Sequence, residues 1–220
     1  SLGTFYDLEV SPEKVKGKKY DDEYFLNTSA VLIGALGSIV AAWHRIRNGD
    51  EPISSKPDCT YAENFLHILG AEKITPLMTR IMDATLVLHG EHTINASTFT
   101  AMVTSSTLAN ESQVVASAIG SLSGPLHGGA NEKVIAMLQK IESKEEIRPW
   151  LDDTLKAKNV VWGMGHREYS VKDPRANILT DMVQELFEER EGGVTDIFEK
   201  AIELEKACEE KLSHKGVYPN

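Results

Sequence analysis

Apolar side chains recur at every third or fourth position over most of this chain, which is the spacing of one face of an α-helix. The segment near the carboxyl end is the clearest, with Glu and Lys standing between Ile197, Ala201, Leu204, Cys208 and Leu212. Convincing alternation of apolar and polar residues, which would indicate strands, is absent. The pattern predicts an all-α fold, with helices over 29–46, 76–88, 96–108, 111–121, 131–141, 148–157, 174–191 and 197–212.

Local start and stop signals support these bounds. Thr75 supplies an N-cap hydroxyl and Pro76 suits the first helical position, while Gly90 supplies a stop. Asp173 followed by Pro174 repeats the start signal. The glycine-rich segment 124–129 is the best candidate for a boundary between two parts of the chain.

Composition places the chain in a broad class. It has 220 residues, of which 41% are hydrophobic and 25% charged, as in an ordinary soluble globular protein. The formal net charge of −10 argues against nucleic acid as a partner, because phosphate binding requires a basic face. An anionic small molecule is still compatible with this charge, since Arg167, Lys172 and Arg175 form a local basic cluster.

The two cysteines and the longest apolar run bear on location. Cys59 and Cys208 lie far apart without C-x-x-C spacing, so we expect reduced thiols and neither a disulfide scaffold nor a zinc cage. The apolar run 30–43 is shorter than a membrane span, and no secretory signal pattern is present. We expect a cytoplasmic protein that has no membrane partner.

The segment GPLHGGAN, residues 124–131, places His127 between glycines just before a predicted helix. Glycines allow close approach of a ligand, and a helix N-terminus favours negative charge. An imidazole there could stabilise an enolate oxygen by hydrogen bonding. The alternative is a glycine-rich helix cap with an incidental histidine.

A second segment, GMGHREYSVKDPR, spans residues 163–175. His166 follows a glycine, and Arg167 and Arg175 supply planar, permanently charged groups suited to carboxylate or phosphate. The alternative is a tight turn followed by a helix capped at Asp173, and the two interpretations are compatible.

A third segment, LHGEH, brings His89, Glu91 and His92 together. Its H-x-E-H spacing matches neither H-E-x-x-H nor H-x-x-E-H of zinc hydrolases, and no third ligand stands out nearby. We therefore expect no metal site here.

In this order and at these separations, the three segments resemble the citrate synthase family. The family carries a HADHE-N-AST-F stretch, then GPLHGGAN, then G-x-GHR-x-Y with DPR behind it, and an aspartate in YPN-V-D. Segments 43–49 and 62–66 are also similar, so the resemblance covers nearly the whole chain. It implies an all-α, multi-helical large domain, here 1–127, and a smaller helical CoA-binding domain, here 128–220. The active site would lie in the cleft between them, which closes when oxaloacetate binds.

The resemblance also implies an activity and residue roles. The family consists of acyltransferases of the tricarboxylic acid cycle, which condense acetyl-CoA with oxaloacetate to give citrate and CoA; acetyl-CoA is a substrate and no cofactor is implied. His127 would stabilise the enolate of acetyl-CoA, and His166 would polarise and protonate the oxaloacetate carbonyl. His92 and Arg175 would hold oxaloacetate. The implied CoA-binding residues are Val160, Val161, Gly163, Met164, Gly165 and Asn220, with the backbone of 160–165 against the adenine end.

The family's carboxylate base follows the Asn of YPN by two residues, whereas this sequence stops at Asn220 and does not begin with Met. Later arginines of the oxaloacetate site, one of them from the dimer partner, would also lie outside it. We expect an internal fragment that is inactive alone. Three departures bear on CoA binding: HGEHT replaces HADHE at 89–93, Ser170 and Val171 stand where relatives commonly have basic residues, and Glu168 adjoins Arg167.

Other interpretations remain open. A 2-methylcitrate synthase, which uses propionyl-CoA, shares these motifs and differs in the shape of the acyl pocket. The departures above motivate a non-catalytic citrate synthase-like protein that serves in binding or dimerisation. The resemblance implies a homodimer, for which the helices predicted at 29–46 and within 76–108 are suitable faces.

Overall fold

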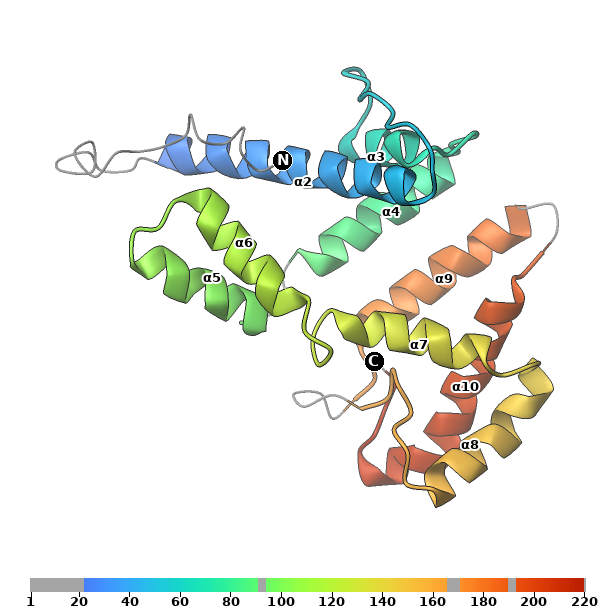
Figure 1. The fold of residues 1–220 in the computed structure, drawn as a ribbon. Helices are drawn as coiled ribbons and strands as arrows, with labels where there is room; N and C mark the ends of the chain where they lie inside the picture. Colours follow the sequence, from blue (N-terminus) through green and yellow to red (C-terminus); the bar gives the residue numbers. More distant parts are fainter. Residues whose placement is uncertain (1–21, 91–93, 166–170, 190–192, 220) are drawn as a thin grey trace. The chain divides into compact units, whose positions relative to one another are not determined.

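The computed structural model describes residues 22–90, 94–165, 171–189 and 193–219. All regular structure in these ranges is helical, which confirms the all-α prediction (Figure 1). The α-helices are α2 (Asp22–Arg47), α3 (Tyr61–Leu69), α4 (Pro76–His89), α5 (Ala96–Ser106), α6 (Glu111–Leu122), α7 (Gly129–Gln139), α8 (Ile147–Lys156), α9 (Pro174–Glu189) and α10 (Asp196–Leu212). Two 3₁₀ turns, η2 (Lys144–Glu146) and η3 (Ser213–Lys215), flank α8 and α10.

The chain divides into two compact units, Ser1–His92 and Thr93–Asn220. The domain boundary predicted at 127/128 falls inside the second unit and stays a prediction. Each unit is described by itself below.

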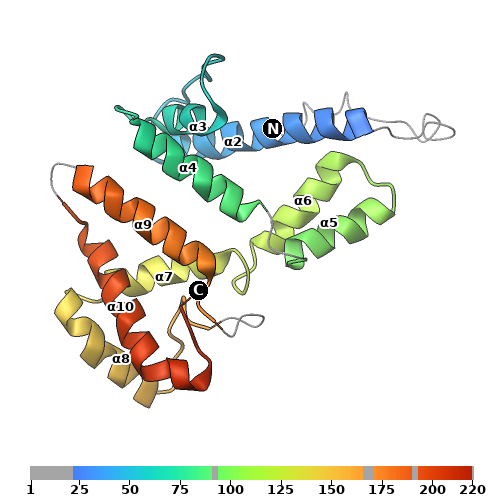
Figure 2. The same ribbon diagram turned by 180° about the vertical axis from the view of Figure 1, so that it is seen from behind.

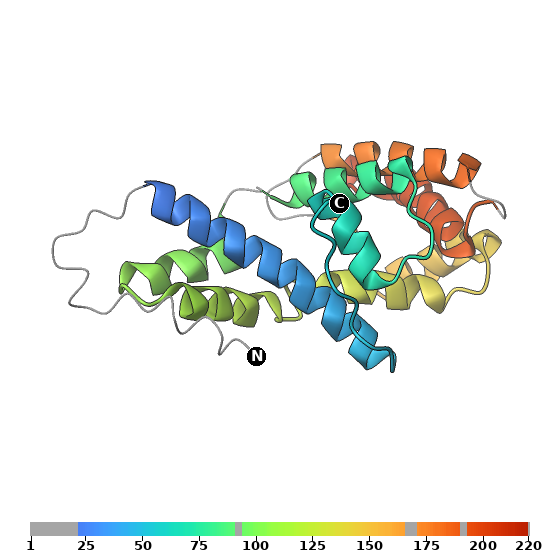
Figure 3. The ribbon, with the colours of Figure 1, turned by 90° about the horizontal axis from the view of Figure 1, so that it is seen from above.

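In the first unit, α3 packs against both α2 and α4, as the view in Figure 3 shows for α2 and α3. Tyr61 donates a hydrogen bond from its hydroxyl to the carbonyl oxygen of Ile33 at 2.9 Å, which ties α3 to the middle of α2. Gly37 makes this approach possible, because a Cβ there would collide with the Tyr61 hydroxyl.

Helix α3 is missing from the sequence prediction, and α2 begins earlier than predicted. Thr60 caps α3 by accepting a hydrogen bond from the Glu63 N–H, and Gly70 ends it in a left-handed conformation at φ 98°. The helix has only 9 residues, so its apolar spacing is too short to stand out before the tertiary contact with α2 is known.

The surface of α2 is unusually apolar. Its exposed side chains include Val31, Val40 and Trp43, whereas Thr28 and Ala41 are buried. The stretch Leu26–Arg47 is long and apolar enough to cross a membrane by length and composition, with a mean hydropathy of 1.6. The prediction that this segment is too short to span a membrane was based on residues 30–43, and it is wrong for the whole helix. One such helix is weak evidence for a span, because core helices pass the same test, and the absence of a membrane partner stays a prediction.

In the second unit, α5 and α6 form a hairpin whose two helices lie side by side in Figures 1 and 2. Asn95 and Asn110 cap the two helices by accepting hydrogen bonds from Thr98 N–H and Gln113 N–H, each at 2.9 Å. Thr104 and Ser117 join the helices through a hydroxyl–hydroxyl hydrogen bond of 2.9 Å.

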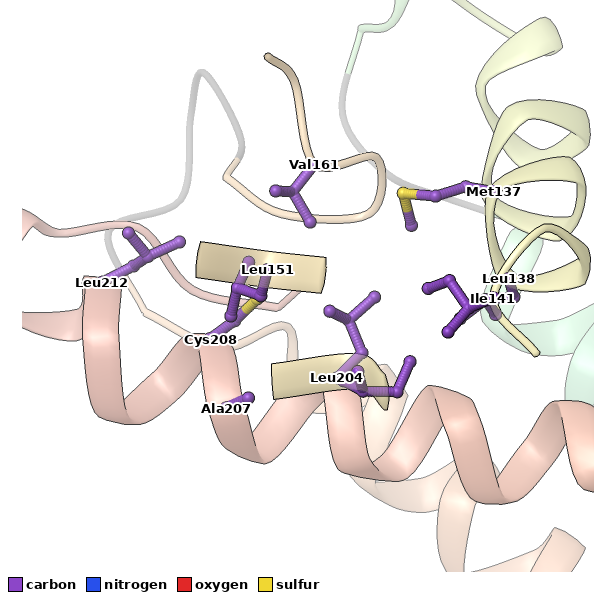
Figure 4. Close-up of a cluster of buried hydrophobic side chains, with 10 residues drawn as sticks. Met137, Leu138, Ile141, Leu151, Val161, Leu204, Ala207, Cys208 and Leu212 are labelled. Carbon is purple, nitrogen blue, oxygen red and sulfur yellow. The ribbon is translucent and has the colours of Figure 1, made fainter. Parts of the chain in front are cut away.

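The core of the second unit lies where α7, α8 and α10 meet (Figure 4). Ile147, Leu151 and Cys208 are its fully buried larger side chains. Burial raises the pKa of the Cys208 thiol to about 11, so this cysteine stays protonated near neutral pH and acts as a small apolar side chain. The apolar spacing read from the last helix is thus confirmed as a core face.

Candidate active site

The His127 side chain is held by a serine of the α5–α6 hairpin. His127 Nε2 lies 2.8 Å from Ser97 Oγ, and the same oxygen lies 3.0 Å from the carbonyl oxygen of Ala118. Ser97 is in the first turn of α5, so the cap at Asn95 helps to fix its position. The three groups belong to α5, α6 and the loop before α7.

The backbone around His127 is a compact turn that requires glycine. His127 N–H donates to Gly124 O at 3.0 Å, and Gly128 N–H donates to Leu122 O at 2.9 Å. A Cβ at Gly128 would lie 2.6 Å from the Leu122 carbonyl oxygen, so a larger residue would force the turn apart. Helix α7 begins at Gly129, earlier than the predicted 131, because the turn leads straight into it.

The N-terminus of α7 has no side-chain cap. Its first two N–H groups, those of Gly129 and Ala130, donate to Gly124 O at 3.3 Å and His127 O at 3.2 Å, and the aligned peptide dipoles give this helix end a partial positive charge. His127 stands immediately before this helix end, so the surroundings favour negative charge that develops next to the imidazole.

Ser97 determines which ring nitrogen of His127 can act. If Ser97 donates to Ala118 O, it accepts from Nε2–H, and Nδ1 of a neutral ring is only an acceptor. If Ser97 donates to Nε2 instead, Nδ1 carries the proton and can donate a hydrogen bond. Only the second arrangement lets a neutral imidazole stabilise an oxyanion.

The backbones of residues 163–165, Asp173 and residues 218–219 are joined by hydrogen bonds. Met164 and Pro219 form an antiparallel bridge, and Gly165 N–H donates to Tyr218 O at 2.8 Å. Asp173 N–H donates to Pro219 O at 3.4 Å. The 163–165, DPR and YPN motifs, which lie far apart in the sequence, are therefore tied together by their backbones.

Two glycines of the GMGHREYSVKDPR segment allow the backbone conformation that these hydrogen bonds require. Gly163 and Gly165 have φ of 84° and 76°, in the left-handed region that side chains disfavour. The turn also fixes the backbone directly before His166.

Arg175 is held in place by a buried carboxylate. Asp173 is 4% exposed, and its Oδ2 accepts from Arg175 Nη2 at 2.6 Å while its Oδ1 accepts from Nε at 3.0 Å. This pairing raises the pKa of the Arg175 guanidinium above its usual value. Asp173 Oδ1 also accepts from the Arg175 backbone N–H at 2.9 Å, so one residue both caps α9 and orients the guanidinium.

Lys172, which belongs to the basic cluster noted in the sequence, forms an ion pair with Glu205 of α10. About a quarter of each side chain is exposed. A phosphate that recruits Lys172 would therefore compete with a carboxylate already in place.

The predicted CoA-binding residues differ in what they can offer. Val160 is 64% exposed, whereas the Val161 side chain is in the core, so only the backbone of Val161 could meet a ligand. Gly163 and Met164 line a cavity of about 350 Å³ together with Asn131, Glu205 and Pro219. Their role in CoA binding stays a prediction.

Three predicted site residues, His92, His166 and Asn220, lie outside the described residues. Within the described ranges no three His, Cys, Asp or Glu side chains gather so as to hold a metal ion.

Sequence reasoning missed three residues near these sites: Ser97, Asp173 as the partner of Arg175, and Glu205. Asp173 stood in the DPR motif only as a helix cap, and its second contact could have been found from the i, i+2 spacing to Arg175. Ser97 belongs to the NAST-F stretch, but nothing in the sequence pairs it with a histidine 30 positions away.

Comparison with known proteins assigns the chain to a class. The model of the citrate synthase C-terminal domain family matches residues 1–220. The chain therefore belongs to the citrate synthase family, which confirms the resemblance read from its motifs.

Individual relatives agree with this assignment. A citrate synthase of Synechocystis sp. is 47% identical over 221 residues, covering 100% of this chain and 53% of the relative. A 2-methylcitrate synthase of Shewanella oneidensis is 38% identical over 156 residues, covering 70% of this chain and 42% of the relative. The chain thus spans about half the length of the curated relatives that it matches.

A solved structure agrees at the level of the fold. The chain superposes on a citrate synthase from Thermoplasma acidophilum, solved as a ternary complex with carboxymethyl coenzyme A and oxaloacetate, with a TM-score of 0.84. The two are 29% identical, and the match covers 100% of this chain and 56% of the other.

Proposed function

We propose that this chain is part of an enzyme that condenses acetyl-CoA with oxaloacetate to give citrate and CoA. The observation that carries the proposal is the placement of His127, which Ser97 contacts at the N-terminus of α7 within the GPLHGGAN motif, where no side chain caps the helix. The citrate synthase relatives, and the oxaloacetate and CoA analogue named for the Thermoplasma complex, support these substrates.

His127 would act on the acetyl group. Removing a proton from the methyl carbon moves negative charge to the thioester oxygen, and the enolate is stabilised if an N–H donor already stands there. The Ser97 hydroxyl donates to Ala118 O in this structure, so its proton would turn to Nε2 in the reaction, which leaves Nδ1–H of a neutral His127 to supply that hydrogen bond. The helix end behind it lowers the energy of the same oxyanion.

Arg175 would bind a carboxylate of oxaloacetate. Its guanidinium has a fixed orientation because Asp173 binds both Nε and Nη2. A guanidinium group with a fixed orientation loses less rotational freedom when substrate binds, and so positions the substrate more accurately. His166 would protonate the carbonyl of oxaloacetate, His92 would help to hold it, and the 160–165 backbone with Asn220 would bind CoA.

The protein would act as a cytoplasmic homodimer in the tricarboxylic acid cycle, without a cofactor. The apolar exposed face of α2 suits burial against a second subunit. Closure of a cleft between two domains would exclude water while the enolate exists.

A second candidate function, 2-methylcitrate synthesis, is supported by the 2-methylcitrate synthase among the relatives. The two activities differ by one methylene in the acyl group, which is worth about 1–3 kcal/mol of discrimination in an apolar pocket.

The test is to assay the full-length protein with oxaloacetate and either acetyl-CoA or propionyl-CoA, following thiol release and identifying the product by mass. We expect citrate as the main product and a higher kcat/KM for acetyl-CoA. A higher kcat/KM for propionyl-CoA would favour the second candidate, and no product from either would contradict both.

Ser97→Ala is expected to lower the turnover of citrate formation about tenfold, the factor that corresponds to losing one orienting hydrogen bond of ~1.4 kcal/mol. Ser105→Ala is the matched control, because Ser105 lies on the same helix and its hydroxyl donates to Met102 O within that helix. Equal turnover in the two variants would remove Ser97 from the positioning of His127.

A further inference from the structure

A row of ion pairs joins η2 and α8 to α10, and nothing in the proposed reaction uses it. Arg148 stands at its centre: Nε donates to Glu203 Oε1 at 2.6 Å, while Nη1 and Nη2 donate to the two carboxylate oxygens of Glu210 at 2.6 and 3.0 Å. These hydrogen bonds from Arg148 lower the pKa of Glu210, so its carboxylate stays charged near neutral pH. The other members of this α8–α10 ion-pair row are Lys144–Glu199 and Lys211–Asp152.

The order of the pairs shows that α8 and α10 run in the same direction. The paired positions on η2 and α8 are 144, 148 and 152, and their partners on α10 are 199, 203 with 210, and 211. Because the numbers rise together, the carboxyl ends of the two helices lie at the same end of the pair. Figure 2 shows α8 and α10 side by side in this arrangement.

Each of the two helices continues into a tight turn. After α8, Lys158 is left-handed at φ 55°, and Asn159 N–H donates back to Thr154 O at 3.0 Å. After α10, Gly216 is left-handed at φ 71°, and its N–H donates to Ser213 O at 2.9 Å. Because both turns are closed by hydrogen bonds to the preceding helix or 3₁₀ turn, a shift of α8 along α10 would move the residues that follow.

The residues that follow the two turns meet at the backbone junction described above. Met164 forms its bridge with Pro219, and Gly165 N–H donates to Tyr218 O at 2.8 Å. Met164 and Val217 also pack against the core of the second unit, which ties the junction to the helices. The position of α8 relative to α10 therefore determines how well the two sides of the junction fit.

The apolar contact between the helices leaves their register less well defined than the ion pairs do. On α10 the buried contact includes Ala207 and Cys208, two small side chains, and apolar contact has no preferred direction. A guanidinium that binds two carboxylates, in contrast, has a planar geometry that fits one arrangement. The Arg148 side chain is 44% exposed, and exposed ion pairs contribute little to stability, so the effect of the row is on position.

We propose that the α8–α10 ion-pair row fixes the register of these two helices and thereby positions the 163–165 backbone for CoA, with Arg148 as its central positioning residue. The link to CoA rests on the proposed function, whereas the link to the junction does not. Without Arg148 the core still holds the helices together, but α8 can shift along α10 and the Gly165–Tyr218 hydrogen bond weakens.

The test compares Arg148→Met with the unchanged full-length protein by hydrogen–deuterium exchange and by steady-state kinetics. We expect the Gly165 amide to exchange about tenfold faster, as for the loss of one charged hydrogen bond. The KM for acetyl-CoA should rise about tenfold, while kcat and the KM for oxaloacetate change by less than about twofold. Arg148→Lys keeps a cation that can bind one carboxylate, and both effects should be smaller in it.

Lys156→Met is the matched control, because Lys156 lies on α8 and pairs with Asp153 of the same helix. It removes one charge and one ion pair without touching α10, so exchange and kinetics should match those of the unchanged protein. Lys211→Met, which breaks the pair with Asp152, is a second variant that should act in the same direction as Arg148→Met.

The amides of the α5–α6 hairpin separate position from general stability. Faster exchange confined to the junction supports the proposal, whereas an equal increase in the hairpin would show a general loss of stability and overturn it. An unchanged Gly165 amide in both Arg148→Met and Lys211→Met would also overturn it. Faster exchange with an unchanged KM for acetyl-CoA would overturn the link to CoA. If the unchanged protein forms no citrate, the proposed function fails, and the exchange data still decide whether the row positions the junction.

Discussion

Replacing His127 by alanine in the full-length protein is expected to lower the turnover of citrate formation by about 10²–10⁴-fold, the usual contribution of one positioned acid–base group. In the proposed reaction the imidazole, which Ser97 contacts at Nε2, donates a hydrogen bond to the developing enolate oxygen. Because the side chain acts after substrate has bound, kcat should fall more than the KM for acetyl-CoA rises. Steady-state kinetics with acetyl-CoA and oxaloacetate measure both quantities.

His44→Ala is the matched control, since His44 is an exposed histidine of α2 whose side chain contacts Asn48, the residue directly after that helix. The thermal unfolding midpoint of the His127 variant should stay close to that of the unchanged protein, because His127 is only partly buried. A His127→Ala protein with near-normal turnover would exclude this residue from the reaction.

The helices were largely predictable from the sequence because most of them carry their own start and stop signals. Thr75, Asn95 and Asn110 cap three helices through local hydrogen bonds that do not depend on the rest of the fold. Helix α3 also has local signals, Thr60 at its start and Gly70 at its end, but its 9 residues are too few for the apolar spacing to stand out before its contact with α2 at Gly37 and Tyr61 is known.

The candidate site was predictable only in part. The motifs identified His127 and Arg175, because glycine-flanked histidines and a DPR triplet can be recognised in the amino-acid sequence alone. The partners that orient them depend on contacts distant in the sequence or on burial: Ser97 is 30 positions from His127, and Asp173 is effective because it is 4% exposed. The sequence therefore shows which side chains could take part in the chemistry, whereas the contacts that orient them follow only from the folded structure.

Asp173→Ala is expected to lower the free energy of unfolding by about 2–4 kcal/mol, because the change removes the cap of α9 and the charged hydrogen bonds to Arg175 together. Asp173→Asn should cost less, about 1–2 kcal/mol, since asparagine caps helices as well as aspartate does, although the charge and one of the two oxygens that accept from Arg175 are lost. Urea unfolding measures both values. Asp181→Asn, an exposed aspartate of α9, is the control and should change stability little.

The asparagine variant separates structure from function. If Asp173 only stabilises the fold, Asp173→Asn that is fully folded at the assay temperature will have an unchanged KM for oxaloacetate. If it orients Arg175, the guanidinium loses its fixed direction, and we expect the KM for oxaloacetate to rise about tenfold while the KM for acetyl-CoA stays within twofold, as for one charged hydrogen bond. Equal changes in both KM values would point to a general loss of site geometry, because a positioning role confined to Arg175 can act only on the substrate that Arg175 binds.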